Sequence, residues 1–169
     1  MTEQTQERHI LAVLVDNEAG VLGRVVGLFS GRGYNIDSLT VSEVNKEKGL
    51  SRITITTFAE QKVVDHIVTL IERIVPVHKV HNLTADGAFV ERTLALVKVK
   101  AIKDKRAEIL HLADSFNAKE VDSTEKSFVF EISDNPILVN EFLAAMKQYG
   151  ILEFARTGIT AIARGSEEF

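Results

Sequence analysis

The hydrophobic pattern of the first half of the chain alternates between strand-like and helix-like segments. His9 to Val15 is a short aliphatic run that predicts a strand, and it ends at a turn-forming segment over 16–20. From Val21 to Arg32 the apolar residues recur at helical spacing, which predicts a helix. Further strands are expected over 36–44, 50–58 and 77–83, with an amphipathic helix over 63–74 that Pro76 ends. This order is βαββαβ, in which two helices cover one face of a four-stranded antiparallel sheet.

The second half of the chain repeats this order. After a loop over 84–87, strands are expected over 92–101, 118–123 and 126–133 and within 151–163, with helices over 104–117 and 136–149. Pro136 fits the first turn of the last helix, where proline is tolerated. The pattern therefore predicts an α+β protein made of two ferredoxin-like βαββαβ domains in tandem, over residues 1–84 and 85–169.

The first strand carries more hydrophobic surface than one such domain can cover. Residues 10–15 are all apolar, although the helices of this fold cover only one face of the sheet. Domains of about 80 residues also bury a low fraction of their chain surface. We therefore expect the other face of this strand to meet another subunit.

Composition removes several classes of function. The chain of 169 residues has a net charge of −4, so it lacks the basic field that attracts nucleic acid or anionic membranes. It contains no cysteine, which excludes disulfides, thiolate catalysis and cysteine-based metal sites and fits a reducing compartment. Neither a signal peptide nor a run of about 20 apolar residues is present. A cytoplasmic protein is expected.

The segment from Asp16 to Leu22 has the groups that a free amino acid requires from a binding site. The N-terminus of the following helix offers free N–H groups to a carboxylate, and Gly20 lets the backbone approach closely or adopt a positive φ. Asn17 offers an amide oxygen, while Val21 and Leu22 supply methyl groups. From spacing alone, a simpler interpretation is favoured: Asn17 caps the helix, and Gly20 only turns the chain.

Other signals favour structural roles. His78 and His81 are three apart on a strand and so face opposite ways, which argues against a shared metal ion. The glycines at 27, 31 and 33 lie in and after a helix instead of between a strand and a helix, so they do not match a phosphate-binding loop. The basic residues at 98, 100, 103, 105 and 106 are typical of a solvated strand end, with a docking or nucleotide site as the alternative. No catalytic grouping and no metal site is predicted.

Longer motifs resemble one known family. The segments NEAGVLGRV at 17–25, GLFSGRGYNIDSLTV at 27–41, LSRITI at 50–55 and ERTLALVKV at 91–99 are similar to the small regulatory subunits of acetohydroxyacid (acetolactate) synthase, whose first domain is an ACT domain. The resemblance covers nearly the whole chain and weakens after about residue 101.

The resemblance implies a regulatory protein without catalytic activity of its own. ACT domains pair edge to edge across a two-fold axis and bind effectors at the join. The residues that match this site are Asn17, Gly20, Val21 and Leu22 in one subunit and Asn35 and Ile36 in its neighbour. The implied partners are a second copy of the chain, a branched-chain amino acid such as valine, and the catalytic large subunit. Thiamine diphosphate, Mg²⁺ and FAD would belong to that large subunit.

Three alternatives to this function can be distinguished. One is a free-standing amino-acid sensor of the same fold with another client. An RNA-binding βαββαβ module would need exposed aromatic residues on its central strands, where residues 52, 54 and 56 are Arg, Thr and Thr. An acylphosphatase-like hydrolase would need an anion-binding arginine in the first loop, where Asp16 and Glu18 stand.

Overall fold

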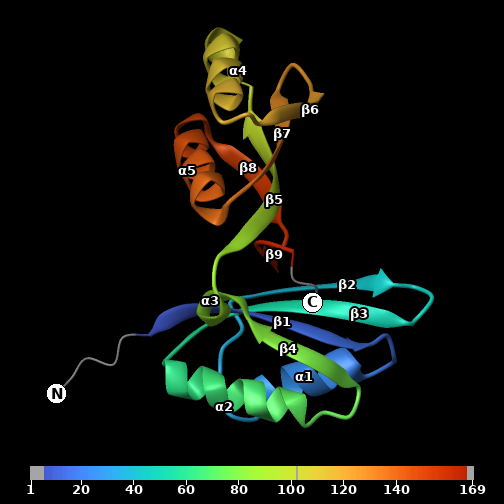
Figure 1. Ribbon diagram of the computed structural model, residues 1–169. Coiled ribbons are helices and arrows are strands. Elements are labelled where there is room, and N and C mark those ends of the chain that lie inside the picture. The colour runs from blue at the N-terminus through green and yellow to red at the C-terminus, as the bar shows by residue number, and fades with distance from the viewer. Residues whose placement is uncertain (1–5, 102, 167–169) are drawn as a thin grey trace, which may run out of the picture. The chain divides into compact units, whose positions relative to one another are not determined.

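The chain folds into two compact units. The computed structural model describes residues 6–101 and 103–166 (Figure 1). The first unit comprises residues 1–90 together with 158–169, and the second comprises residues 91–157. The predicted boundary at 84/85 therefore lies six residues too early, and the end of the chain belongs to the first unit instead of the second.

The first unit contains the βαββαβ order that the sequence predicts. Its elements are β1 (Glu7–Asp16), α1 (Val21–Ser30), β2 (Ser38–Asn45), β3 (Leu50–Ala59), α2 (Gln61–Glu72) and β4 (Val77–Asn82). The strands form an antiparallel sheet in the order β2-β3-β1-β4, and α1 and α2 lie against one of its faces (Figure 1). The predicted loop over 84–87 is partly a short helix, α3 (Leu83–Asp86).

The core of this unit lies between the helices and the sheet. Val21, Val25 and Phe29 are four residues apart on α1, so they form one buried stripe. The stripe of α2 and the inward residues of β1, which include Leu11 and Val13, complete the same hydrophobic cluster. The buried stripes of the two helices therefore pack against the inward face of the sheet.

The end of the chain covers the opposite face of the sheet. Its strand β9 (Thr160–Ala163) pairs with the start of β5 (Phe89–Lys100). Ile159 and Ala161 form a second cluster with Leu83 and with Ile10 and Ala12 of β1, both of which are fully buried. The prediction that this face of β1 meets another subunit is therefore wrong for Ile10 and Ala12. The sequence pattern showed that the face is buried but could not show which segment buries it.

The second unit repeats the fold around an aromatic core. Beside β5 its elements are η1 (Lys103–Lys105), α4 (Arg106–Ser115), β6 (Lys119–Ser123), β7 (Ser127–Asp134), α5 (Pro136–Met146), η2 (Lys147–Tyr149) and β8 (Ile151–Arg156). The strand order is β6-β7-β5-β8. Phe130 and Phe142 pack edge to face with ring centroids 6.3 Å apart, and both are fully buried. The single last strand predicted within 151–163 is two strands, because Gly158 takes the chain from β8 back into the first unit.

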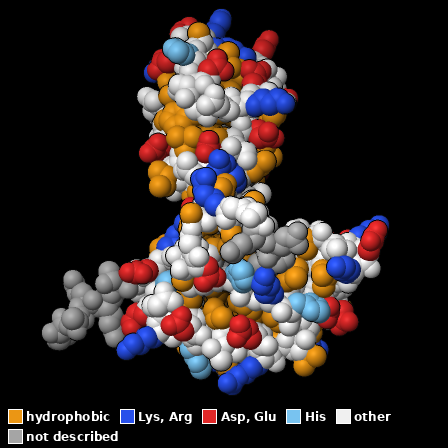
Figure 2. Space-filling model, in the orientation of Figure 1, with side chains coloured by type: hydrophobic (Ala, Val, Ile, Leu, Met, Phe, Trp, Pro, Cys, Tyr) orange, Lys and Arg blue, Asp and Glu red, His pale blue; other side chains and the backbone are white. Residues whose placement is uncertain are grey.

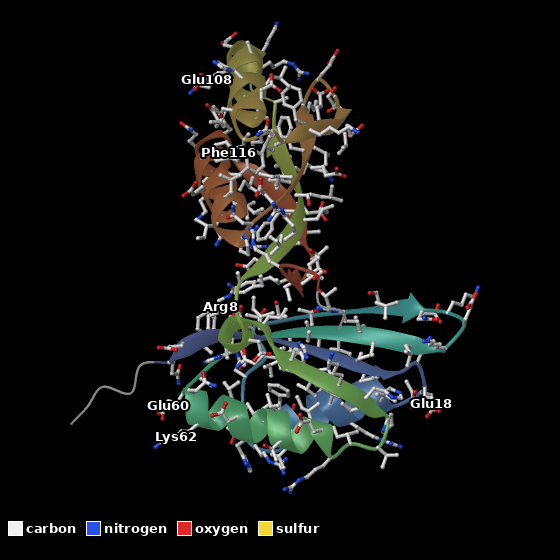
Figure 3. All side chains as sticks on the ribbon, viewed as in Figure 1. Arg8, Glu18, Glu60, Lys62, Glu108 and Phe116 are labelled. Atoms are coloured by element: carbon white, nitrogen blue, oxygen red, sulfur yellow. The ribbon has the colours of Figure 1, made fainter. Side chains whose placement is uncertain are left out.

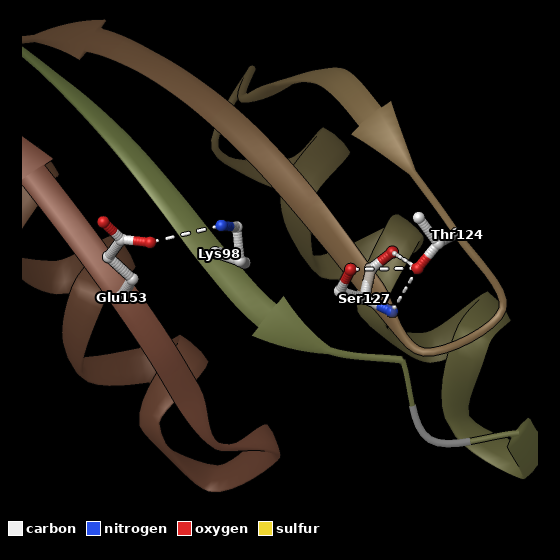
Figure 4. A network of polar contacts seen from close by, with 4 residues as sticks. All are labelled: Lys98, Thr124, Ser127 and Glu153. Carbon is white, nitrogen blue, oxygen red and sulfur yellow. Dashed lines mark hydrogen bonds and ion pairs between the residues drawn. The ribbon is translucent and has the colours of Figure 1, made fainter.

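Polar contacts outside the aromatic core also stabilise this unit. Thr124 Oγ1 stabilises the β6–β7 hairpin by accepting a hydrogen bond from Ser127 N at 3.0 Å, and Lys98 forms an ion pair with Glu153 at 3.2 Å (Figure 4). The hydroxyl of the buried Tyr149 donates to Glu108 Oε1 at 2.7 Å. That hydrogen bond, together with burial and the charge of Glu108, raises the pKa of Tyr149.

Candidate effector-binding site

The loop between β1 and α1 is built around a left-handed glycine. Gly20 has φ 87° and ψ −10°, a conformation that disfavours residues with a Cβ atom, and α1 begins at Val21. The loop is held by a hydrogen bond from Asn17 N to Gly49 O at 2.6 Å. Of the two possibilities that the sequence left open at Gly20, close backbone approach or a positive φ, the structure has the positive φ.

The first turn of α1 presents backbone N–H groups without a side-chain cap. The helical ladder begins with the bond from Arg24 N to Gly20 O at 3.0 Å, so the amides of Leu22 and Gly23 precede it. Among the described residues no side chain caps this helix, and its first turn contains no acidic residue. The interpretation of Asn17 as a helix cap is therefore wrong. The free N–H groups and the helix dipole favour an anion at this position.

Asn17 instead reaches the edge strand of the sheet. Its Nδ2 donates to Glu43 Oε1 of β2 at 3.2 Å, and both side chains are exposed. Glu43 is a site neighbour that sequence reasoning did not identify, because the two residues are 26 positions apart. This hydrogen bond orients the Asn17 amide so that Nδ2 faces Glu43 and Oδ1 remains available as an acceptor.

The two predicted aliphatic residues of the loop have different environments. Val21 is 2% exposed and belongs to the core, whereas Leu22 is 37% exposed. Only Leu22 is placed to offer methyl groups to a ligand at the surface. Val21 supports the site by fixing the start of α1.

Asn35 and Ile36 lie at the other end of the sheet. Thr57 Oγ1 donates to Asn35 O at 2.7 Å, and Ile36 packs against the core. In the register of β1 and β3, Asp16 is opposite Leu50 and His9 is opposite Thr57. Seven strand residues at about 3.3 Å each place the two groups roughly 20 Å apart. Glu18 of the loop and Glu60, the N-cap residue directly before α2 (Gln61–Glu72), mark these opposite ends (Figure 3). One chain alone does not bring the predicted residues together.

Strand β2 is an edge of the first sheet. It stands first in the strand order, and within the described part of the chain it pairs with β3 only. Val41 and Val44 on this strand are 43% and 51% exposed. An edge strand of eight residues with exposed aliphatic side chains is a surface on which another strand can pair.

Contacts of Asp16 with residues near the start of β4 hold the loop in place. His78 Nε2 lies 2.6 Å from Asp16 Oδ1, and Asp16 N donates to Pro76 O at 2.9 Å. These contacts tie the start of β4 to the end of β1, directly before Asn17. His81, three residues after His78 on β4, is not part of this pair. No group of three or more histidine or acidic residues able to hold a metal ion occurs in the described ranges.

The basic residues near 98–106 are dispersed among structural contacts. Arg106 stacks over Phe128 at 4.2 Å and donates to Thr124 O at 2.8 Å, while Lys105 lies over Tyr149 at 5.7 Å. Acidic and basic side chains are interspersed on the face shown in Figure 2. The structural interpretation of this cluster is therefore favoured. Within the described residues, no helix combines the length and hydrophobicity required to cross a bilayer.

Two family models match this chain. Residues 11–79 match the AHAS small subunit-like ACT domain, and residues 92–165 match the model described as the small subunit of acetolactate synthase.

Whole-chain comparisons agree with these matches. A probable acetolactate synthase small subunit of Archaeoglobus fulgidus is 42% identical over 95% of this chain and 99% of its own length. The acetolactate synthase isozyme 3 small subunit of Escherichia coli is 38% identical over 95% and 98%, respectively. The crystal structure of the acetolactate synthase small subunit from Thermotoga maritima has a TM-score of 0.86, with 34% identity over 95% of this chain and 99% of that one. An ACT fold, a second ferredoxin-like unit and full-length similarity to these proteins show that the chain belongs to the acetolactate synthase small-subunit family.

Proposed function

We propose that this protein is the regulatory subunit of an acetolactate synthase, and that it binds valine or a related branched-chain amino acid to confer feedback inhibition on a catalytic large subunit. The observation that carries the proposal is the loop at Gly20, which offers uncapped helix N–H groups beside an amide oxygen and an exposed aliphatic side chain. These are the groups that a small apolar amino acid requires.

The site is completed by a second copy of the chain. If β2 pairs antiparallel with β2 of a neighbour across a two-fold axis, the end of one β2 meets the start of the other. Glu43, at the end of β2, contacts Asn17 of the loop, and residues 35–36 lie two positions before its start at Ser38. The pairing therefore places the loop of one copy near Asn35 and Ile36 of the other. The separation of these groups in one chain supports a homodimeric site.

The ligand's three groups match different parts of this site. The carboxylate is held at the N–H groups of Leu22 and Gly23, where the missing Cβ of Gly20 leaves room. The ammonium is held by Asn17 Oδ1 within reach of the charge of Glu43. Leu22 and the neighbour's copy of residue 36 enclose the aliphatic side chain. This division favours a small branched side chain over a long or charged one.

The chemistry of acetolactate formation belongs to the partner. In this proposal the small subunit is non-catalytic and cytoplasmic, and thiamine diphosphate, Mg²⁺ and FAD bind to the large subunit. The effector changes activity by favouring one arrangement of the complex, which requires different affinities for the two arrangements.

Reconstitution with the catalytic subunit tests the proposal. Adding this chain is expected to raise acetolactate formation and make it sensitive to valine, while isothermal titration of this chain with valine, leucine and isoleucine establishes the preferred effector. A chain that binds valine but neither contacts nor activates the large subunit would be a free-standing sensor. Absence of binding to all three amino acids would refute the effector assignment.

A further inference from the structure

Glu43 stands on the side of the first sheet that faces α1. Leu39 of β2 packs against the core between the sheet and the helices, and residues two and four positions further along a strand share its face. Glu43 is the second of these, opposite Ser51 of β3. The register then shifts between Glu43 and Asn45, so the regular strand ends directly after this carboxylate. The pattern of β2 therefore places Glu43 beside the loop that begins α1.

The charge of Glu43 is not neutralised within the described ranges. Its Oε1 accepts a hydrogen bond from Asn17 Nδ2 at 3.2 Å, and no ion pair joins it to a cation among the described residues. Asp16, a carboxylate at the start of the loop, differs because His78 Nε2 lies 2.6 Å from its Oδ1. The side chain of Glu43 is exposed, so its charge is available to a ligand at the loop.

The chemistry of the proposed effector makes this charge a means of discrimination. The 2-oxo acid that corresponds to valine has the same carboxylate and the same methyl groups, and a carbonyl oxygen replaces its ammonium group. The N–H groups of α1 and the side chain of Leu22 fit both compounds. The two compounds differ only at the groups that face the ammonium, which are Asn17 Oδ1 and Glu43.

We propose that Glu43 is a specificity-determining residue, which makes the effector site select amino acids and reject the corresponding 2-oxo acids. This inference rests on the proposed function. The Glu43 carboxylate attracts an ammonium group and repels a carbonyl oxygen. It also holds Asn17 Nδ2, so the Asn17 amide cannot turn this donor toward a carbonyl without losing the hydrogen bond.

This selection matters in the proposed complex. Pyruvate, from which acetolactate forms, is itself a 2-oxo acid with a carboxylate and a small apolar group. An effector site that recognised only these two groups would bind the substrate of the large subunit as well as the effector. The requirement for an ammonium group therefore separates the feedback signal from the substrate.

Titration calorimetry of the full chain with L-valine, 3-methyl-2-oxobutanoate and pyruvate tests this proposal. The natural chain is expected to bind valine at least roughly tenfold more tightly than either 2-oxo acid. Glu43→Gln keeps the size of the side chain and an acceptor for Asn17 but removes the charge. It is expected to weaken valine binding roughly fivefold. It is expected to bind 3-methyl-2-oxobutanoate at least as tightly as the natural chain does, because the repulsion is removed.

The responses to the two compounds separate recognition of charge from a structural role. If Glu43 only shaped the loop, Glu43→Gln would weaken valine and its 2-oxo acid by the same factor, and the proposal would be overturned. Glu47→Gln is the matched control, because it removes an exposed carboxylate from the hairpin directly after β2. It is expected to change neither affinity. A loss of valine binding equal to that of Glu43→Gln would show a general effect of charge.

The same titrations distinguish this inference from the proposed function. If the natural chain binds no branched-chain amino acid, the proposed function fails and this inference fails with it. If the natural chain binds valine and 3-methyl-2-oxobutanoate equally, the effector assignment stands and the selection for an ammonium group is wrong. Unchanged valine affinity in Glu43→Gln would likewise leave the effector assignment intact and overturn the role of Glu43.

Discussion

Substitution of Gly20 by aspartate places a carboxylate where we propose that the effector's carboxylate binds. No atom lies within 4 Å of a Cβ built on Gly20, so the Cβ of the new residue meets no steric obstacle in the free chain. Its backbone conformation, φ 87°, costs an L-residue about 1–2 kcal/mol, and less for aspartate and asparagine. The domain is therefore expected to fold.

The effect on binding is much larger. Two charge-assisted hydrogen bonds to the effector carboxylate contribute about 1.5–3 kcal/mol each, so their loss weakens affinity by roughly a hundredfold or more. Gly20→Asn is the matched control, because asparagine has nearly the same size and the same tolerance of positive φ but no charge. It is expected to bind valine more weakly than the natural chain and more tightly than Gly20→Asp.

The assay measures valine inhibition and activation in the same reconstituted enzyme, with the unfolding free energy of each variant. Gly20→Asp is expected to abolish inhibition while activation persists, because we propose that the loop is separate from the surface that docks the large subunit. If valine inhibition survives, the effector binds elsewhere. If activation is lost as well, the loop contacts the large subunit. Equal valine affinity of the two variants would show that bulk, and not charge, excludes the effector.

Four other outcomes are expected. The purified chain alone should form no acetolactate from pyruvate in a product assay, and measurable turnover would contradict a non-catalytic subunit. Val41→Lys, on the exposed edge strand β2, should convert a dimer to a monomer in sedimentation velocity, because like charges then meet across the two-fold axis; an unchanged dimer would exclude pairing through β2. Gly158→Ala should destabilise the first unit by about 1–3 kcal/mol in denaturant unfolding, because its Cβ would lie 2.5 Å from Leu39 O; an unchanged midpoint would mean that the return segment is loosely held. Phe142→Ala should cost about 3–5 kcal/mol, since this ring is fully buried in the second core, and a loss below 1 kcal/mol would contradict that packing.

Local pattern was sufficient to predict most elements of this fold. Helical spacing of Val21, Val25 and Phe29 fixes which side of α1 is buried, and alternation in β3 fixes its inward face, because both depend only on neighbouring residues. That Gly20 has a special backbone role was predictable for the same reason, and the structure shows that this role is a positive φ. The motifs around residues 17–41 indicated the family, which the comparisons confirmed.

Features that depend on residues far apart in the chain required the tertiary structure. The apolar second face of β1 indicated burial, but only the fold shows that Ile159 and Ala161, about 150 residues away, bury it instead of another subunit. The contact of Asn17 with Glu43 has the same origin, since strand order and register bring the two residues together. The sequence by itself determined which face of each element is apolar and where the chain turns, because both properties depend on neighbouring residues. Which segments meet was decided by the packing of the whole unit, because many pairings satisfy the same hydrophobic pattern and only one satisfies all of them together.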